Sequence, residues 1–242
     1  MTDSQTPDPQ QAPSTPGFKM LSVLGGIAMM SGFLVVLVFQ LTKPIIAENQ
    51  RLAIERAVFK VVKGATVRRD YLVTSEGVKP VTAGKSTGEG ITIYGAYDDR
   101  GKLLGIAVNG AGMGYAGLVH ILYSYDPECA CIRSFEVLKS TETPGLGDKI
   151  ITDPAFQANF NTSKGLAAHL NAAGASLENA IVTVKHGSKQ HPWQIDAISG
   201  ATITSKAVGK ALNQSAQRLL PLLIPHLDSI RQIELPKPGP KE

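Results

Sequence analysis

The chain has 242 residues, enough for one sizeable domain or two small ones with a buried core. Its apolar fraction of 43%, its charged fraction of 18% and its mean hydropathy of +0.02 exclude a disordered charged tail and a polytopic membrane protein. The net charge of +4 is mild, and no Lys/Arg cluster is dense enough to indicate nucleic-acid binding. Two cysteines cannot form a disulfide framework or a complete structural zinc site.

An apolar block near the start, residues 20–42, contains no charged side chain. A helix of this length, at about 1.5 Å per residue, crosses a hydrocarbon core of roughly 30 Å. A cleaved signal peptide would have a shorter apolar region, roughly 7–15 residues, before a small-residue cleavage site. The sequence TKPI at 42–45 offers no such site. We therefore predict an uncleaved transmembrane anchor at 19–43, preceded by a disordered tail at 1–18 that is rich in Pro, Gln, Ser and Thr.

Counting basic residues does not settle which side of the membrane the remaining chain occupies. Lys19 is the only basic residue before the anchor, whereas Lys43, Arg51, Arg56 and Lys60 follow it closely. This bias would place the large domain in the cytoplasm. The positive-inside rule is weak for long translocated domains, however, so the side stays open on charge alone.

The chain after the anchor predicts an α+β domain at 44–227 and a C-terminal tail at 228–242. A helix is expected from Pro44, in its first turn, to about Lys63. Alternating apolar runs bounded by Gly, Asp or Pro predict antiparallel strands, and helical spacing or composition predicts further helices. The expected strands are 91–99, 102–110, 119–126, 130–138 and 181–187, and the expected helices are 153–160, 162–174 and 205–227.

The most informative segment is DAISGATITS at 196–205, directly before the last amphipathic helix. Its small residues would let the backbone approach a ligand closely, and its hydroxyl groups add hydrogen-bond donors. The free N–H groups and positive dipole end of the following helix suit a phosphate. The competing interpretation is a simple helix cap, in which Ser or Thr satisfies the first N–H groups.

Two further segments are rich in glycine. TETPGLGD at 141–148 follows a strand and is either a Pro-Gly turn or a rigid loop that walls a planar ligand. GAGMGYAG at 110–117 superficially matches a dinucleotide-binding fingerprint, but no βαβ pattern surrounds it. We interpret it as a turn between strands that brings Tyr115 close to a flat ligand.

Together, DAISGATITS, ETPGLGDK, GMGYAG and the single anchor resemble the FMN-binding G subunit of the Rnf electron-transport complex. They are also similar to the related C subunit of sodium-translocating NADH:quinone reductase. The Asp148-Lys149 continuation after Gly-Leu-Gly looks more like the Rnf member. The resemblance covers roughly residues 20–220. It implies an electron-relay subunit of a membrane-bound ferredoxin:NAD oxidoreductase that pumps ions, and this subunit is not expected to be catalytic on its own.

In that family the motif is recognised by a flavin transferase, which esterifies the phosphate of FMN to the motif threonine. The resemblance implies that Thr202 is this acceptor, with Thr204 as the nearby rival, and that Asp196 and Ser199 belong to the recognition signal. The remaining residues implied to bind the cofactor are Ser199 itself, Gly200, Ala201, Glu142, Thr143, Leu146, Gly147 and Tyr115. Glu142 either contacts the ring or caps the turn.

The resemblance also implies a place for the protein in the cell. The anchor would lie in the lipid of the bacterial inner membrane, the flavin domain would face the periplasm, and the partners would be other membrane subunits of the complex. No metal site and no nucleic-acid partner are expected. The alternative function is a tethered assembly or binding protein in which SGATITS only caps a helix.

Two features have no place in this resemblance. Cys129 and Cys131 are expected on one face of a strand, where a disulfide between them would be strained. Free thiols compete with an intermolecular or cluster-related role, and we predict inert free thiols. Trp193 lies three residues before Asp196 and could pack over the flavin, although ordinary core or surface packing is the simpler expectation.

Overall fold

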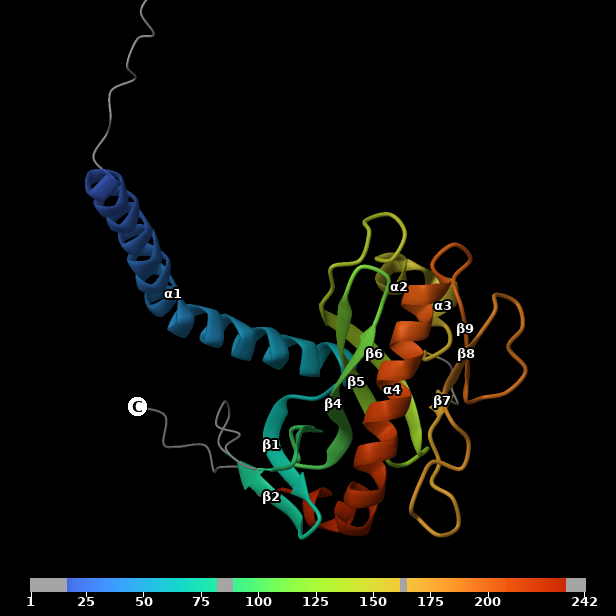
Figure 1. Cartoon of the computed structure of the whole chain (residues 1–242). Helices are drawn as coiled ribbons and strands as arrows, with labels where there is room; N and C mark the ends of the chain where they lie inside the picture. The colour runs from blue at the N-terminus through green and yellow to red at the C-terminus, as the bar shows by residue number, and fades with distance from the viewer. Residues whose placement is uncertain (1–16, 82–88, 162–164, 234–242) are drawn as a thin grey trace, which may run out of the picture. The chain divides into compact units, whose positions relative to one another are not determined.

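The computed structural model describes residues 17–81, 89–161 and 165–233 (Figure 1). The chain divides into two compact units between Asn49 and Gln50. Residues 1–16 of the predicted N-terminal tail lie outside the described residues, whereas Gly17 already belongs to the first helix.

Helix α1 (Gly17–Val61) is a single helix of 45 residues that contains the predicted anchor. Its most apolar window has a mean hydropathy of 2.3 and no buried residue, as expected of a segment whose surroundings are lipid. The expectation that Pro44 lies in the first turn of a new helix is wrong, because Pro44 lies inside α1. Proline removes one backbone hydrogen bond there, but its fixed φ is compatible with the helix.

The second unit is built on an antiparallel sheet in the order β2-β1-β3-β4-β5-β6-β7. The four predicted strands in its middle are confirmed, with adjacent strands paired in sequence order, as expected of a meander. The flanking strands β1 and β2 form a hairpin that was not expected from the sequence. The bounds are β1 (Val67–Thr74), β2 (Gly77–Val81), β3 (Ile91–Tyr97), β4 (Leu103–Met113), β5 (Leu118–Asp126), β6 (Cys131–Lys139) and β7 (Leu166–Ala167).

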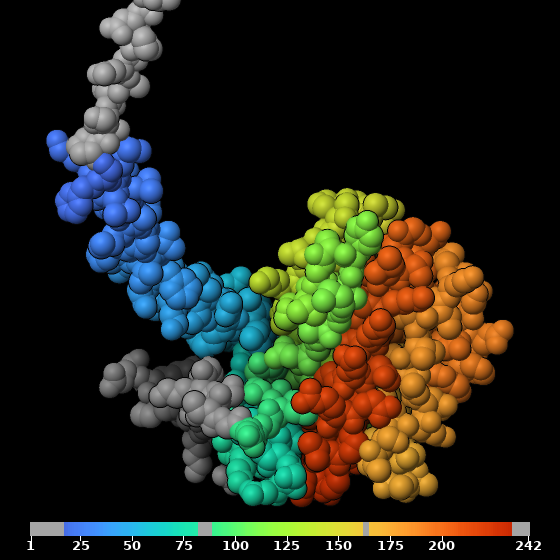
Figure 2. Space-filling view, in the orientation of Figure 1, coloured from blue at the N-terminus to red at the C-terminus, as the bar shows by residue number. Residues whose placement is uncertain are grey.

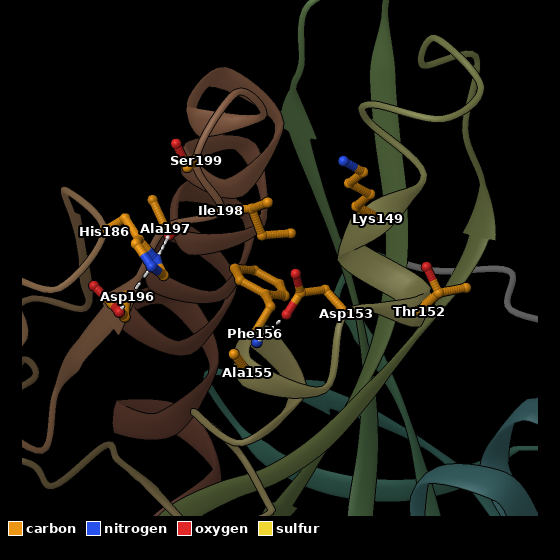
Figure 3. Close-up of a pocket in the computed structure, with 10 residues that line it drawn as sticks. All are labelled: Lys149, Thr152, Asp153, Ala155, Phe156, His186, Asp196, Ala197, Ile198 and Ser199. Carbon is orange, nitrogen blue, oxygen red and sulfur yellow. Dashed lines mark hydrogen bonds and ion pairs between the residues drawn. The ribbon is translucent and has the colours of Figure 1, made fainter.

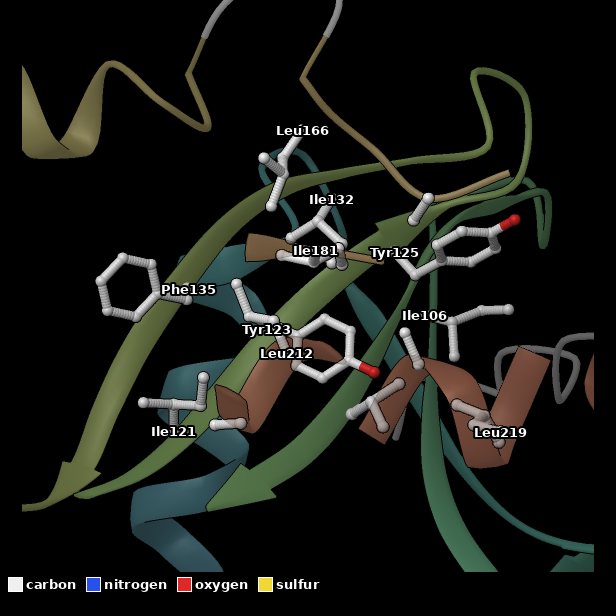
Figure 4. Packing of buried hydrophobic residues seen from close by; sticks show 14 of the residues in the cluster. Ile106, Ile121, Tyr123, Tyr125, Ile132, Phe135, Leu166, Ile181, Leu212 and Leu219 are labelled. Carbon is white, nitrogen blue, oxygen red and sulfur yellow. The ribbon is translucent and has the colours of Figure 1, made fainter. Parts of the chain in front are cut away.

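Both faces of this sheet are covered. Successive residues of a strand point to opposite faces, and residues 105–108 of β4 and 121–125 of β5 are accordingly all buried. On one face, Ile106, Ile121 and Tyr123 pack against helix α4 (Thr202–Leu223), which presents Leu212 and Leu219 (Figure 4). On the other face, the last turns of α1 contribute a smaller cluster, made of Ala57, Val58, Val61, Val62, Tyr94, Ala96, Ala107 and Leu122. Fully burying one Leu or Ile side chain contributes roughly 1.5–3 kcal/mol, so these two layers hold the domain together.

A second, two-stranded sheet lies beside α4. Here β8 (Val182–Val184), predicted within 181–187, pairs in parallel with β9 (Gln194–Asp196). Because β9 ends at Asp196, this sheet delivers the chain directly to the segment that precedes α4. Helix α4 begins at Thr202, three residues earlier than predicted, and after Leu223 the chain continues as a 3₁₀ helix, η1 (Ile224–Ile230).

The predicted helix at 162–174 is wrong in its described part. Leu166 is fully buried in β7, where it pairs with Ile132 at the edge of the sheet. Gly165 and Gly174 adopt left-handed backbone angles, with φ of 61° and 68°, that interrupt a helix. Pairing with the sheet therefore overrides the helical composition of this segment; residues 162–164 lie outside the described residues.

Two short helices follow β6. Helix α2 (Lys149–Thr152) was not predicted, and α3 (Pro154–Gln157) lies within the helix predicted at 153–160. The carboxylate of Asp153 caps α3 by accepting the N–H of Phe156 at 3.0 Å.

The domain's packing extends beyond the predicted boundary at 227. Ile230 and Ile233 are buried, and the N–H of Ile233 donates to the carbonyl of Gly101 at 3.0 Å. Residues 228–233 are thus part of the packed unit, while 234–242 of the predicted tail lie outside the described residues.

The prediction of free thiols is also wrong, because Cys129 and Cys131 form a disulfide. The expected geometry placed both on one strand, but β6 begins only at Cys131. Ala130 between them has a positive φ of 48°, which turns the backbone and brings the two Cα atoms to 5.2 Å. That separation is within the usual range for a disulfide.

Candidate functional site

Three segments that are distant in sequence converge at one end of the sheet: the tip of the β4–β5 hairpin, the loop after β6, and the start of α4. Figure 2 shows the yellow-green surface of the loop beside the green hairpin tip and the orange beginning of α4. Between them lies a cavity of about 550 Å³. Its walls are formed by Tyr115, Glu142, Thr143, Leu146, Gly147, Gly200, Ala201, Thr202, Ile203 and Thr204.

The hairpin tip supplies one wall. As predicted for the glycine-rich segment, residues 114–117 form the turn between β4 and β5, closed by the N–H of Gly114 donating to the carbonyl of Gly117 at 2.8 Å. The ring of Tyr115 is 74% exposed, so the turn presents an aromatic surface that no other part of the described chain covers.

The loop after β6 supplies a second wall. The carbonyl of Thr143 accepts the N–H groups of Leu146, at 3.2 Å, and Gly147, at 2.9 Å, which closes a turn around Pro144. Gly145 has a φ of 78°, a conformation that favours glycine. The turn leaves the side chain of Leu146 half exposed at the cavity.

The start of α4 supplies the floor, and its structure bears on the helix-cap interpretation. The N-cap residue is Ala201, and within the described residues no side chain caps this end of the helix. The buried hydroxyl of Ser205 instead secures the preceding turn, accepting from the N–H of Ile198 at 3.1 Å and donating to the carbonyl of Ala201 at 2.9 Å. The motif is therefore not a Ser or Thr cap, and the first N–H groups of α4 remain available for a ligand.

The carboxylate of Glu142 joins all three segments. It is 8% exposed and accepts hydrogen bonds from the N–H groups of Tyr115 at 3.2 Å and Ala116 at 2.9 Å, and from the hydroxyl of Thr204. Burial acts to raise the pKa of Glu142, but these hydrogen bonds outweigh it and hold the pKa below its usual value. Glu142 is thus an ionised group in the cavity wall at neutral pH.

The two threonines at the start of α4 differ in accessibility. Thr204 is 3% exposed and its hydroxyl is bonded to Glu142, whereas Thr202 is half-buried at the edge of the cavity. Of these two α4 threonines, Thr202 is the one whose hydroxyl is accessible to a reagent that approaches the cavity.

A second cavity, of about 380 Å³, is lined in part by the beginning of the same motif, residues 196–199 (Figure 3). Asp196 and Ser199 line it together with Lys149 from α2 and His186. One ring nitrogen of His186, Nδ1, lies 2.9 Å from the carbonyl of Ala197 and 3.6 Å from Oδ2 of Asp196. The other oxygen of Asp196, Oδ1, is buried without a hydrogen-bond partner among the described residues.

Of the ten residues predicted to bind a cofactor, nine line the larger cavity, and Ser199 lines the second one instead. Ile203 completes the larger cavity and was not predicted, although its position between two predicted residues was a usable signal. Trp193 lines neither cavity and stacks on His191, with ring centroids 4.6 Å apart.

Comparison with known proteins gives two family matches. Residues 114–217 match the family described as "FMN-binding domain", and residues 22–61 match the "RnfG N-terminal region". The first match spans all three walls of the larger cavity, and the second lies within α1.

Two relatives are named as G subunits of ion-translocating oxidoreductase complexes. The protein of Methanosarcina acetivorans is 33% identical over 61% of this chain and 70% of its own length. That of Aliivibrio fischeri strain MJ11 is 30% identical over 80% of this chain and 85% of its own. The crystal structure of Shewanella oneidensis NqrC matches 76% of this chain and 98% of that chain with a TM-score of 0.57 and 19% identity, which shows a shared fold.

Proposed function

Because this chain belongs to the family of G subunits of ion-translocating oxidoreductase (Rnf) complexes, we propose that it holds FMN as a covalent phosphoester on Thr202. It is an FMN-binding, electron-relay subunit of a membrane-associated complex that transfers electrons between ferredoxin and NAD and moves ions. It works with the other subunits of that complex rather than as an enzyme alone.

The observation that carries the covalent proposal is the contrast between the two threonines. The cavity collects nine of the ten residues expected around the cofactor, and only one of its two α4 threonine hydroxyls is accessible. Because the hydroxyl of Thr204 is hydrogen-bonded to Glu142, the geometry favours Thr202 as the acceptor.

The residues of the cavity fit FMN. Its volume of about 550 Å³ is within the range of roughly 300–1,000 Å³ of small-molecule sites. Tyr115, Leu146 and Ile203 offer apolar surface to a planar ring, while the uncapped start of α4 offers N–H groups and a positive dipole end to a phosphate. When bound, FMN supplies the electron-transfer chemistry, and the chain positions it and sets its electrostatic surroundings.

The second cavity supports a separate role for the beginning of the motif. Asp196 and Ser199 line the second cavity and not the cofactor cavity, together with Lys149 and His186, so another protein could contact this cavity without displacing the flavin. We assign them to recognition by a flavin transferase, which would reach Thr202 from the neighbouring cavity.

We further propose that α1 anchors the protein in the lipid of the inner membrane and that the flavin domain lies on the periplasmic side. Disulfides persist in oxidising compartments and are rare in the cytosol, so the Cys129–Cys131 disulfide supports the periplasmic side against the charge bias. In intact cells, a membrane-impermeant thiol reagent added after an equally impermeant reductant should label these cysteines. A cytoplasmic domain would stay unlabelled until the cells are lysed.

The covalent proposal is tested with the full chain co-expressed with a flavin transferase and run on a denaturing gel. The unmodified sequence should show flavin fluorescence, Thr202→Val should abolish it, and the matched variant Thr204→Val should retain it. Fluorescence that survives Thr202→Val but not Thr204→Val would move the acceptor to Thr204. Absence of fluorescence in all three proteins would refute covalent attachment.

A further inference from the structure

Glu142 occupies a special position in the cavity because it is a buried carboxylate whose two oxygens are both used as acceptors. Oε1 accepts from the N–H of Ala116, and Oε2 accepts from the N–H of Tyr115 and the hydroxyl of Thr204. These donors come from the β4–β5 hairpin tip and from the first turn of α4. One side chain from the loop after β6 therefore fastens the other two walls of the cavity.

Only a glutamate satisfies this arrangement. Glutamine has nearly the same shape, but its NH₂ group would face an N–H donor of the hairpin tip, whichever way the amide is turned. Aspartate is one methylene shorter and would not reach both the hairpin tip and α4 from the same backbone position. The contact thus depends on the charge and the length of the side chain.

The side chain of Glu142 leaves no space for a Cβ atom at two neighbouring glycines. A Cβ atom on Gly114 would lie 2.5 Å from Oε1 of Glu142, and one on Gly147 would lie 2.5 Å from its Cβ and 3.0 Å from Oε2. Both separations of 2.5 Å are far inside van der Waals contact. Two glycines of the motifs GMGYAG and ETPGLG therefore make room for Glu142 itself.

We propose that Glu142 is a positioning residue that, as an anion, fixes the Tyr115 wall and the start of α4 before the flavin is attached, and afterwards disfavours electrons on the flavin. The first effect concerns this chain alone. The second rests on the proposed function, because it requires a flavin in the cavity.

The electrostatic part follows from the location of the charge. Glu142 lines the same cavity as Thr202, and its carboxylate is shielded from bulk water, so its field is screened less than that of a surface carboxylate. A fixed negative charge beside a redox group opposes the addition of an electron. Removing this charge should therefore raise the midpoint potential of the bound flavin.

The test compares Glu142→Gln with Glu178→Gln in the full chain. The control removes the same charge from Glu178, which is exposed. Its neighbour Leu177 donates its N–H to the side chain of Gln217, which places Glu178 beside a part of α4 that is far from Thr202. The first measurement is amide hydrogen exchange over residues 113–118 in protein produced without the transferase. Because each lost bond is to a charged acceptor, exchange should rise by at least ~10-fold in Glu142→Gln and stay unchanged in Glu178→Gln.

The second measurement is the midpoint potential of the flavin-loaded proteins by spectroscopic titration. It should move upward in Glu142→Gln and stay in place in Glu178→Gln. Unchanged exchange together with an unchanged potential would overturn the proposal. The exchange measurement needs no flavin, so its outcome is separate from whether FMN is attached at Thr202.

Thr204→Val provides a second variant in case Glu142→Gln does not fold. It keeps the carboxylate and removes one of the donors that hold it in place. Exchange over 113–118 should then rise several-fold, by less than in Glu142→Gln. A rate equal to that of the unmodified sequence in Thr204→Val would contradict the clamp.

Discussion

The cofactor cavity depends on close packing between β4 and the start of α4, and Gly112 is the position where this can be tested most sharply. A Cβ atom on Gly112 would lie 2.1 Å from the carbonyl oxygen of Ala207 and 2.9 Å from its carbonyl carbon. Both are backbone atoms of α4, so no side-chain rotation can relieve the contact. In Gly112→Ala the helix must move by about 1 Å relative to the strand, since real Cβ contacts are essentially never shorter than 3.0 Å.

The expected cost follows from this displacement. Overpacking a tight interface costs typically about 1–3 kcal/mol, and a backbone-to-backbone contact belongs at the upper end, so we expect a loss of ~3 kcal/mol. For a domain of this size that loss lowers Tm by roughly 6–12 °C. Because Thr202 and Thr204 are carried by the displaced end of α4, covalent flavin should also decrease.

Thermal unfolding of the flavin-free full chain, followed by near-UV circular dichroism, measures the loss. The matched control is Ala111→Val, which adds bulk at the neighbouring, exposed position, where the side chain points to the opposite face of the strand. The control should leave Tm nearly unchanged. A Gly112→Ala protein that melts within about 3 °C of the unmodified chain, which corresponds to roughly 1 kcal/mol, would refute the reasoning.

Three other results are expected. Ser205→Ala removes the only hydroxyl in the described chain that pairs with the N–H of Ile198, and should cost about 1–3 kcal/mol in chemical denaturation, whereas the more exposed Ser199→Ala should cost less than about 0.5 kcal/mol. Ser199→Ala should nevertheless slow the appearance of flavin fluorescence during incubation with a transferase, without altering the absorption spectrum of the product. The pKa of Glu142 is lower in the folded chain than its unfolded value of 4.5, so its stabilisation is present above pH 4.5 and is lost as the pH falls toward the folded pKa. The difference in unfolding free energy between the unmodified chain and Glu142→Gln should therefore shrink below pH 4.5, and a difference independent of pH would contradict an ionised Glu142.

The elements that could be predicted from the sequence are those whose pattern is local. The strands from Ile91 to Lys139 alternate and are bounded by turn residues, and each pairs with its neighbour in the chain. The apolar run in α1 could be predicted for the same reason, because its length and composition alone indicate a helix long enough to span a membrane. Their positions depend on little beyond the hydrophobic pattern of each segment.

The elements that could not be predicted depend on distant partners. The composition of 162–174 is helical, but Leu166 gains more by filling the space beside Ile132 in the sheet than by entering a short helix. The disulfide likewise depends on the positive φ of Ala130, which no pattern in the sequence indicates. In each case a contact or a backbone angle outside the local pattern decides the outcome.

The proposed cofactor site depends partly on local sequence and partly on distant partners. The difference between its two α4 threonines illustrates both contributions. A helix turns by about 100° per residue, so Thr202 and Thr204 point about 200° apart, on nearly opposite sides of α4. Both line the cavity, and their spacing alone does not say which of the two hydroxyls stays accessible. The difference comes from Glu142, which lies sixty-two residues before Thr204 in the chain. Its carboxylate accepts a hydrogen bond from the buried hydroxyl of Thr204. If FMN is attached at Thr202 as proposed, the acceptor is selected by the same buried charge that joins the cavity walls, so the position of attachment depends on the shape of the pocket.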